Sequence, residues 1–305
     1  MNFNAKMVYT IDRDESHFYD QVKMPQFDYS LVAVGDSQGN FVFFDPGDKY
    51  LPIKRIAWYN EGTKGLIVGD MNRQFISLNC SKSNQNQVMR FQDFQLDDDL
   101  TLIGRITEKS NGQAAYVIRQ NLSSSSEQER LDFLKKYLLD LYPETQIDSI
   151  SINGLQDPEE NLVIEAHRKI PTSVIQMGNH ILLKPMAFIA EQENPFSAAE
   201  RKFPIIFDYA KELTEIVRIT LPPEWQVEAL PEPITFSNNV GLCQITFESF
   251  EQSNLLNVQY RFILNSPFWK AESYADVRNL FEYRQTIEDQ IVSLKIKEDK
   301  EDTAQ

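Results

Sequence analysis

The chain has 305 residues, 42% of them hydrophobic, and a net charge of −15. This much apolar material can fill more than one packed core, so the composition excludes a wholly disordered chain. The acidic balance disfavours nucleic acid and anionic lipid as partners. No stretch approaches the roughly 18 consecutive apolar residues of a membrane span, so we expect none. The N-terminus lacks a basic start followed by an apolar run, so we expect no signal peptide.

The first 75 residues predict a small antiparallel sheet. A strand is expected at Ala5–Ile11, and the stretch Gln26–Pro46 is typical of two strands joined by a turn, with Asp45 after the second. Gly65–Val68 adds a further apolar strand. Because an aspartate before Pro-Gly can accept nearby backbone N–H groups, a structural turn is one interpretation of Asp45.

The middle of the chain predicts a hairpin followed by a helix. Strands are expected at Leu100–Glu108 and Gln113–Arg119, since the Asn-Gly pair between them adopts a tight turn easily. Ser126 and Glu129 then form a capping box at the start of a leucine-rich helical pattern, which Pro143 ends. A polar, proline-bearing stretch at 190–204 separates this region from the next.

The last third predicts strands followed by a helix. Apolar and polar residues alternate over Cys243–Phe247 and Leu256–Leu264, so each strand is expected to bury one face. Prolines bracket a shorter strand at Trp225–Ala229. An apolar stripe of helical spacing runs through Ser273–Gln290, and the residues after Leu294 are expected to form a frayed tail.

The first sheet also carries an ordered series of motifs. They are Phe27-Asp28-Tyr29, Phe44-Asp45, Asp48, Tyr50-Leu51-Pro52 and Gly65-Leu66-Ile67-Val68. This order resembles the closing part of bacterial transglutaminase-like proteins, in which a strand opening with Phe-Asn-His leads through a hairpin to an aspartate. Those proteins have a papain-like core among β-rich domains of unknown function.

A second series of motifs runs through the last third of the chain. It consists of Asn194-Pro195-Phe196, Arg201-Lys202-Phe203-Pro204, Leu221-Pro222-Pro223-Glu224-Trp225, Leu230-Pro231 and Ile291-Val292-Ser293-Leu294-Lys295. This series resembles the C-terminal part of the same proteins, so the resemblance covers nearly the whole chain.

The resemblance implies a degenerate catalytic site. The family uses a cysteine at a helix start, a histidine base and an aspartate that orients the histidine. We expect the cysteine-bearing helix to lie upstream of this chain, the histidine position is Tyr29, and the aspartate position is Asp45. A phenol with an ordinary pKa near ~10 is a poor base at neutral pH. Tyr29 and Asp45 are therefore expected to be vestigial, with the phenol hydrogen-bonded to the carboxylate.

The other thiols and imidazoles do not predict a replacement site. Cys243 lies on the apolar face of its strand, and Cys80 lies outside the papain-like region, so neither is expected to be a nucleophile. His17 lies in a polar loop and offers a minor alternative for the missing base, while His167 and His180 are expected to be exposed.

No metal or cofactor is predicted. The three histidines are scattered, and the run Asp97-Asp98-Asp99 lacks the glycine and ligand spacing of a calcium loop. Such a charge run is usually a solvated turn.

Large aromatic residues allow two interpretations. Trp58, Trp225 and Trp269 are candidates for a groove that binds sugars or peptides. Aromatic residues also dominate ordinary cores and domain seams, which is the interpretation that the sequence favours.

The predicted fold class is therefore α+β and β-rich. Residues 1–75 are expected to form an antiparallel sheet remnant of a papain-like core, 76–190 a β-rich unit with one helix, 191–298 a sandwich-like unit with a terminal helix, and 299–305 a disordered tail. Without helices against it, the remnant sheet exposes an apolar face that something must cover.

The favoured function is a non-catalytic binding or structural module, so we predict that the chain is not an enzyme. One alternative is a partial chain of a cysteine-dependent transglutaminase-like hydrolase or acyltransferase that needs a missing N-terminal half. Another is a carbohydrate- or peptide-binding β-sandwich. The expected partner is a protein or peptide, such as a separately encoded N-terminal half or a second copy. Relatives commonly carry export signals, so the resemblance suggests the cell envelope, although this chain itself leaves the compartment open.

Overall fold

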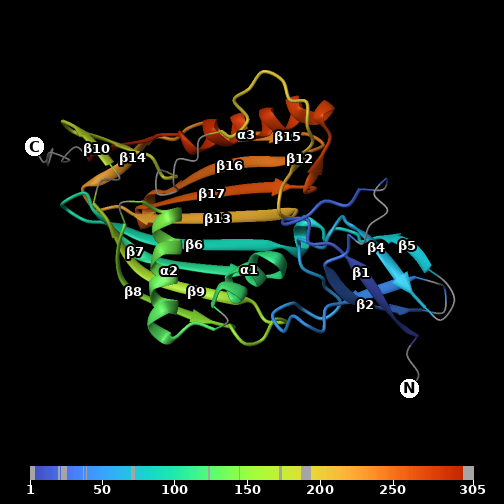
Figure 1. The fold of residues 1–305 in the computed structure, drawn as a ribbon. Helices are drawn as coiled ribbons and strands as arrows, with labels where there is room; N and C mark the ends of the chain where they lie inside the picture. The colour runs from blue at the N-terminus through green and yellow to red at the C-terminus, as the bar shows by residue number, and fades with distance from the viewer. Residues whose placement is uncertain are drawn as a thin grey trace, which may run out of the picture.

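The computed structural model describes residues 4–297, apart from 20, 22–25, 37, 39, 70–72, 123, 144, 172–173 and 187–193. This part of the chain is α+β and rich in antiparallel strand, as the sequence predicts. A five-stranded sheet near the N-terminus lies beside a larger eight-stranded sheet (Figure 1). No helix among the described residues is long and apolar enough to cross a membrane. The predicted tail at 299–305 lies outside the described residues.

The five-stranded sheet is entirely antiparallel and has the order β3-β2-β1-β4-β5. Its strands are β1 (Ala5–Thr10), β2 (Tyr29–Gly35), β3 (Phe41–Phe44), β4 (Lys64–Val68) and β5 (Arg73–Ser77). Alternation of side chains gives the sheet two different faces. Val8, Leu31 and Ile67 point to one face and are buried in a core with Ile56 and Leu78.

The eight-stranded sheet forms the body of the molecule and has the order β15-β16-β17-β13-β6-β7-β9-β8. Its strands are β6 (Gln87–Leu96), β7 (Leu102–Ser110), β8 (Gln146–Asn153), β9 (Leu162–Ile170), β13 (Lys211–Thr220), β15 (Ile234–Ser237), β16 (Gly241–Phe250) and β17 (Leu255–Leu264). The pair β13–β6 is parallel, and every other pair in this sheet is antiparallel.

Three helices cover one face of this sheet, which we call the inner face (Figure 1). They are α1 (Gly112–Leu122), α2 (Glu127–Leu141) and α3 (Tyr274–Glu288). Helix α2 packs near β8, whereas α3 packs on β15 and β16, so the two helices cover opposite halves of the sheet. The predicted capping box of α2 is confirmed, because Ser126 and Glu129 exchange side-chain and backbone hydrogen bonds.

The remaining elements are small. A four-stranded sheet has the order β10-β11-β19-β14 and contributes Ile181, Leu183 and Leu294 to the main core. Its strands are β10 (Val174–Met177), β11 (His180–Leu183), β14 (Trp225–Ala229) and β19 (Val292–Ile296), and the other elements are β12 (Ile205–Ile206), β18 (Phe268–Trp269) and the short 3-10 helices η1 (Ser83–Gln85), η2 (Glu251–Ser253) and η3 (Ala271–Ser273). Strand β19 continues to Ile296, so Lys295 and Ile296 belong to a strand and not to the frayed tail expected after Leu294.

The strand predicted at Gln113–Arg119 is wrong, because these residues belong to α1. Gly112 has a φ of +55°, which ends β7 without forming a two-residue hairpin, and the backbone N–H of Ala115 already donates to the carbonyl of Asn111. The buried residues Ala114, Ala115, Ile118 and Leu122 follow helical spacing. The Asn-Gly pair marks a turn, but the pattern after it has the period of a helix.

The eight-stranded sheet also joins residues from both sides of the division expected near residue 190. Strand β13 lies after that division and pairs along its length with β6, which lies before it. The two expected β units therefore share one sheet and one core, and helices rather than a second full sheet cover most of the inner face.

Candidate functional site

Tyr29 and Asp45 are brought together at the end of the five-stranded sheet. Tyr29 begins β2, and Asp45 directly follows β3, its antiparallel neighbour. The Tyr29 hydroxyl donates a hydrogen bond to Asp45 Oδ2 at 2.6 Å. This confirms the predicted contact between Tyr29 and Asp45, and it places a phenol against the carboxylate.

A second tyrosine–aspartate pair adjoins the first. Tyr116 of α1 donates to Asp48 Oδ2 at 2.6 Å, and its hydroxyl lies 3.1 Å from that of Tyr59. The ring of Tyr59 meets the ring of Tyr29 edge-on, with centroids 5.7 Å apart. We call Tyr29, Asp45, Asp48, Tyr59 and Tyr116 the tyrosine–aspartate cluster. Because Tyr116 comes from α1, the cluster joins the two large sheets.

The electrostatics of the cluster favour neutral phenols as hydrogen-bond donors. Burial and the hydrogen bond to Asp45 raise the pKa of Tyr29, and the same two causes, with Asp48 as the acceptor, raise the pKa of Tyr116. Burial also raises the pKa of Asp45, while the hydrogen bond from Tyr29 opposes that rise. A phenol that keeps its proton and donates it in a hydrogen bond to a carboxylate cannot act as a general base.

Removing the Tyr29 hydroxyl is expected to destabilise the five-stranded sheet. Tyr29→Phe leaves a half-buried Asp45 carboxylate without its donor, which costs about 1 kcal/mol at neutral pH. Loss of the donor raises the pKa of Asp45 further, so the deficit shrinks as the pH falls and the carboxyl becomes protonated. Urea unfolding at pH 7 and pH 4 measures this, with the exposed Tyr19→Phe as the control. An equal deficit at both pH values contradicts the assignment.

Neither cysteine is placed or activated as a nucleophile. Burial and the nearby Glu61 raise the pKa of Cys80 to about 11. Cys243 is buried in the main core beside Tyr260, and burial raises its pKa to about 12. Thiols with these pKa values carry almost no thiolate at neutral pH. The sequence-based expectation that both are structural agrees with this chemistry.

The junction between the two sheets is dense in hydrogen bonds. The Gln113 amide accepts from the Trp58 backbone N–H and donates to the Ile56 carbonyl and to Glu61. Arg13 donates to backbone carbonyls on both sides, those of Trp58, Glu61, Phe207 and Asp208. Its guanidinium also lies over the rings of Trp58 and Phe268, 5.1 and 4.9 Å from their centroids.

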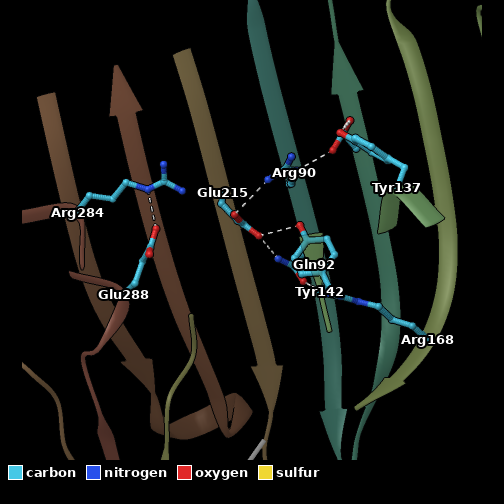
Figure 2. A network of polar contacts seen from close by, with 9 residues as sticks. Arg90, Gln92, Tyr137, Tyr142, Arg168, Glu215, Arg284 and Glu288 are labelled. Atoms are coloured by element: carbon cyan, nitrogen blue, oxygen red, sulfur yellow. Dashed lines mark hydrogen bonds and ion pairs between the residues drawn. The ribbon is translucent and has the colours of Figure 1, made fainter. Parts of the chain in front are cut away.

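A buried row of charge crosses the inner face of the eight-stranded sheet (Figure 2). Strand register places Glu108 of β7, Arg90 of β6 and Glu215 of β13 directly opposite one another. Arg90 Nε lies 2.7 Å from Glu108 Oε2, and Arg90 Nη1 lies 3.9 Å from Glu215 Oε2. We call these three residues the charge row. Glu108 and Glu215 are fully buried, and Arg90 is only slightly exposed.

Tyr137 of α2 and Tyr142, which directly follows the helix, contact the two carboxylates of the charge row. Tyr137 donates to Glu108 at 2.8 Å, and Tyr142 donates to Glu215 at 3.1 Å. Although burial disfavours its charge, Tyr142 and Glu108 raise the pKa of Arg90 well above its usual value. Burial raises the pKa of Glu215, and Arg90 opposes that rise. The row is thus held together by its central cation.

A second buried arginine extends the row along the sheet (Figure 2). Arg168 of β9 donates to the amide oxygen of Gln92, whose amide nitrogen donates to Glu215. The Arg168 guanidinium lies 4.0 Å from the centroid of the Tyr142 ring, while its Nε and Nη1 have no hydrogen-bond partner among the described residues. Burial lowers the pKa of Arg168 to about 10.

The three tryptophans do not share one groove. Trp225 is buried in the main core, Trp269 is half-buried with its ring N–H bonded to the Ser266 carbonyl, and Trp58 is half-buried beneath Arg13. Because they lie in three different surroundings, they do not form the aromatic platform that a sugar would need.

The three histidines lie in separate elements of the part of the chain that the structure describes. His17, His167 and His180 are all exposed; His17 contacts the Ser16 carbonyl, and His180 pairs with Glu228 at 3.0 Å. No group of three or more His, Cys, Asp or Glu side chains among these residues is arranged to hold a metal ion.

Sequence reasoning missed the charge row, although a signal was present. Arg90 lies two residues from Val88, and Glu215 lies two residues from Val217. Residues two apart share a face of a strand, so each charge falls on the buried face of its strand. A lone charge at a core-facing position indicates a buried partner. The partner itself could not be found without the parallel β13–β6 register.

Comparisons with known proteins found a family match to part of the chain and a solved structure of low similarity. Residues 179–293 match the family described as "Domain of Unknown Function with solved-structure structure (DUF3858)". A solved structure from Parabacteroides distasonis ATCC 8503, described as a "putative protease", matches with 9% sequence identity and a TM-score of 0.46. The match covers 96% of this chain and 40% of that structure, so the chain spans less than half of it. No curated protein matches the chain.

Proposed function

We propose that this chain is a non-catalytic, protein-binding module derived from a transglutaminase-like protein. The observation that carries the binding role is an apolar face of the five-stranded sheet whose side chains are exposed or only half-buried among the described residues. The absence of catalysis is supported by the Tyr29–Asp45 hydrogen bond and by two thiols whose burial keeps them protonated.

The exposed face, which we call the outer face, is built from the side chains opposite the buried core of the same sheet. Its members are Met7, Tyr9, Val32, Val34, Val42, Phe44, Leu66, Val68 and Phe75. Strand register places Met7, Val32 and Phe44 in one row across three strands, and Tyr9, Leu66 and Phe75 in another. Phe75 is 59% exposed even though the ring of Phe18 contacts it.

A contiguous apolar face of this kind indicates an interaction surface, because isolated soluble proteins rarely expose one. A shallow depression of about 350 Å³ opens in it between Val32, Val34, Phe44 and Pro46. The occupant that we propose is an amphipathic helix of a protein partner, whose apolar side chains fill the depression. The resemblance supports this choice, since the helical half of a papain-like core packs on its sheet.

Photo-crosslinking tests this assignment. A photoreactive phenylalanine analogue in place of Val42, which is exposed on the outer face, is expected to capture a helical segment of another polypeptide in producing cells. The matched control places the same analogue at Arg105, which is exposed on the eight-stranded sheet opposite its inner face. This control is expected to capture no polypeptide. Mass spectrometry identifies the captured peptide. Val42→Glu, introduced beside a photoreactive residue at Tyr9, is expected to abolish that capture.

Capture of a second copy of this chain through the same face contradicts the helical partner and replaces it with a symmetric dimer. Equal crosslinking from positions 42 and 105 contradicts a dedicated binding face altogether.

The alternative of a partial enzyme is favoured by the same outer face, since a separately encoded helical half would dock there. The Tyr29 phenol opposes it, because a restored thiol would still meet a hydrogen-bond donor where the base belongs.

A further inference from the structure

A cavity of about 230 Å³ lies on the inner face of the eight-stranded sheet, between the helices that cover its two halves. Its floor comes from β6, β7, β13 and β17, one wall comes from α1 and α2, and Arg284 of α3 stands opposite. Lys211, at the start of β13, lines the cavity and remains exposed, so solvent reaches the space beside it. This volume is below the ~300–1,000 Å³ of pockets for drug-sized ligands, so any occupant is small.

The cationic groups of the cavity are not equally neutralised. Arg90 pairs with Glu108, and Arg284 pairs with Glu288 at 2.8 Å. Glu212, the other acid at the cavity, is bonded to Arg261. Lys211 has no hydrogen bond or ion pair among the described residues, although the more distant Asp208 attracts it.

An unpartnered hydroxyl supplies a second, independent sign of a ligand. Ser110 of β7 lines the cavity, is 2% exposed, and its Oγ has no hydrogen-bond partner among the described residues. Leaving a buried hydroxyl unpaired is costly, and native structures usually satisfy such groups with water or a ligand. Together, Lys211 and Ser110 offer an ammonium and a hydroxyl without partners.

The rest of the lining is apolar and comes from several elements. It consists of Val88, Ala114, Val117, Ile118, Leu141, Leu213 and Phe262. The cavity therefore has a polar region with one unpaired cation and an apolar region that can bury a hydrocarbon body.

We propose that this cavity binds a small monocarboxylate with an apolar body. Lys211 neutralises the carboxylate, Ser110 donates a hydrogen bond to it, and the apolar lining buries the hydrocarbon part. Phosphate dianions fit poorly, because the one ammonium without an acidic partner among the described lining residues balances only one negative charge. The proposal is independent of the outer face and of any catalytic role.

The charge on Lys211 gives the site a pH dependence. Although the Lys211 side chain is partly exposed, desolvation by the surrounding protein and the neighbouring Arg284 and Arg90 lower the pKa of Lys211 to about 8, while Asp208 opposes this. Tyr137, Tyr209, Glu108 and Glu212 also line the cavity. Because the neutral amine cannot form an ion pair with a carboxylate, the affinity of the cavity for the monocarboxylate is expected to fall as the pH rises through about 8. Near pH 7, where the amine is protonated, this affinity is expected to be close to its maximum.

Isothermal titration of the whole chain with hexanoate and its neutral isostere hexanamide tests the proposal. Hexanoate is expected to bind saturably at pH 7 and at least about tenfold more tightly than hexanamide, a difference of ~1.4 kcal/mol. Lys211→Met keeps the aliphatic length but removes the charge, and is expected to remove this preference. The matched control is Lys109→Met, next to Ser110 in sequence but exposed on the other face of the sheet.

Leu213→Trp fills the cavity from its floor, so it is expected to weaken the binding of hexanoate and of hexanamide alike. Thermal melts confirm that each variant is folded before titration. The proposal is overturned if folded wild-type protein shows no saturable hexanoate binding, if hexanamide binds as tightly, or if Lys211→Met retains the preference for the carboxylate.

Discussion

Replacing Arg90 by methionine is expected to lower the free energy of unfolding by about 3–5 kcal/mol. Arg90 is the only cation between Glu108 and Glu215 in the charge row, and both carboxylates are almost completely buried. Removing one partner of a buried charge pair leaves the other without compensation, which costs far more than the net value of the pair. This loss is a large fraction of the stability of an ordinary domain.

Urea unfolding of Arg90→Met at pH 7 measures this cost. The matched control is Arg105→Met, an exposed arginine on the neighbouring strand, for which a change within about 0.5 kcal/mol is expected. Replacing all three members of the row by apolar residues is expected to recover most of the loss, since none of its three charges is then left without its partner. The account of the row is contradicted if Arg90→Met and Arg105→Met unfold at the same urea concentration.

Replacing Gln113 by methionine is expected to cost about 3 kcal/mol and to loosen the junction between the two large sheets. The Gln113 side chain satisfies the Ile56 carbonyl, the Trp58 backbone N–H and the Glu61 carboxylate at once. Methionine fills a similar volume but leaves these groups unpaired. Burial already raises the pKa of Glu61, and loss of the Gln113 donor raises it further.

Hydrogen exchange together with urea unfolding separates the two effects of Gln113→Met. Amides of β1, β2 and β4 are expected to exchange faster, while those of β16 and β17, which pair with each other in the eight-stranded sheet, keep their protection. Gln120→Met, an exposed glutamine on the same helix, is the control. Uniform loss of protection across both sheets argues against a local junction role.

The sequence predicts local structure well where one short segment decides it. The capping box at Ser126 fixes the start of α2, and the strands around Tyr29 and Asp45 place both side chains at the same end of a hairpin, so their hydrogen bond could be foreseen. The alternation over Leu256–Leu264 gives the buried face of β17 without knowledge of its neighbours. In each case, contacts within the segment or its next neighbour determine the outcome.

What the sequence does not predict depends on distant pairing. The parallel contact between β6 and β13 joins residues more than a hundred positions apart. It places the two expected β units in one sheet and brings Glu215 opposite Arg90 in the charge row. The cavity beside Lys211 exists because α1 and α2 cover one half of the inner face and α3 covers the other. The sequence predicts a strand where helix α1 lies, because the Asn-Gly pair is typical of a hairpin turn and the helical pattern after it is short.

The most direct test of the central proposal is intact-mass spectrometry of the purified chain after incubation with an activated acyl donor. Wild type and Tyr29→His are expected to keep their mass, because the thiols of Cys80 and Cys243 stay protonated whether or not an imidazole stands beside Asp45. An acyl adduct on Cys80 that reacts on to an added amine, and that Cys80→Ser abolishes, contradicts a non-catalytic module.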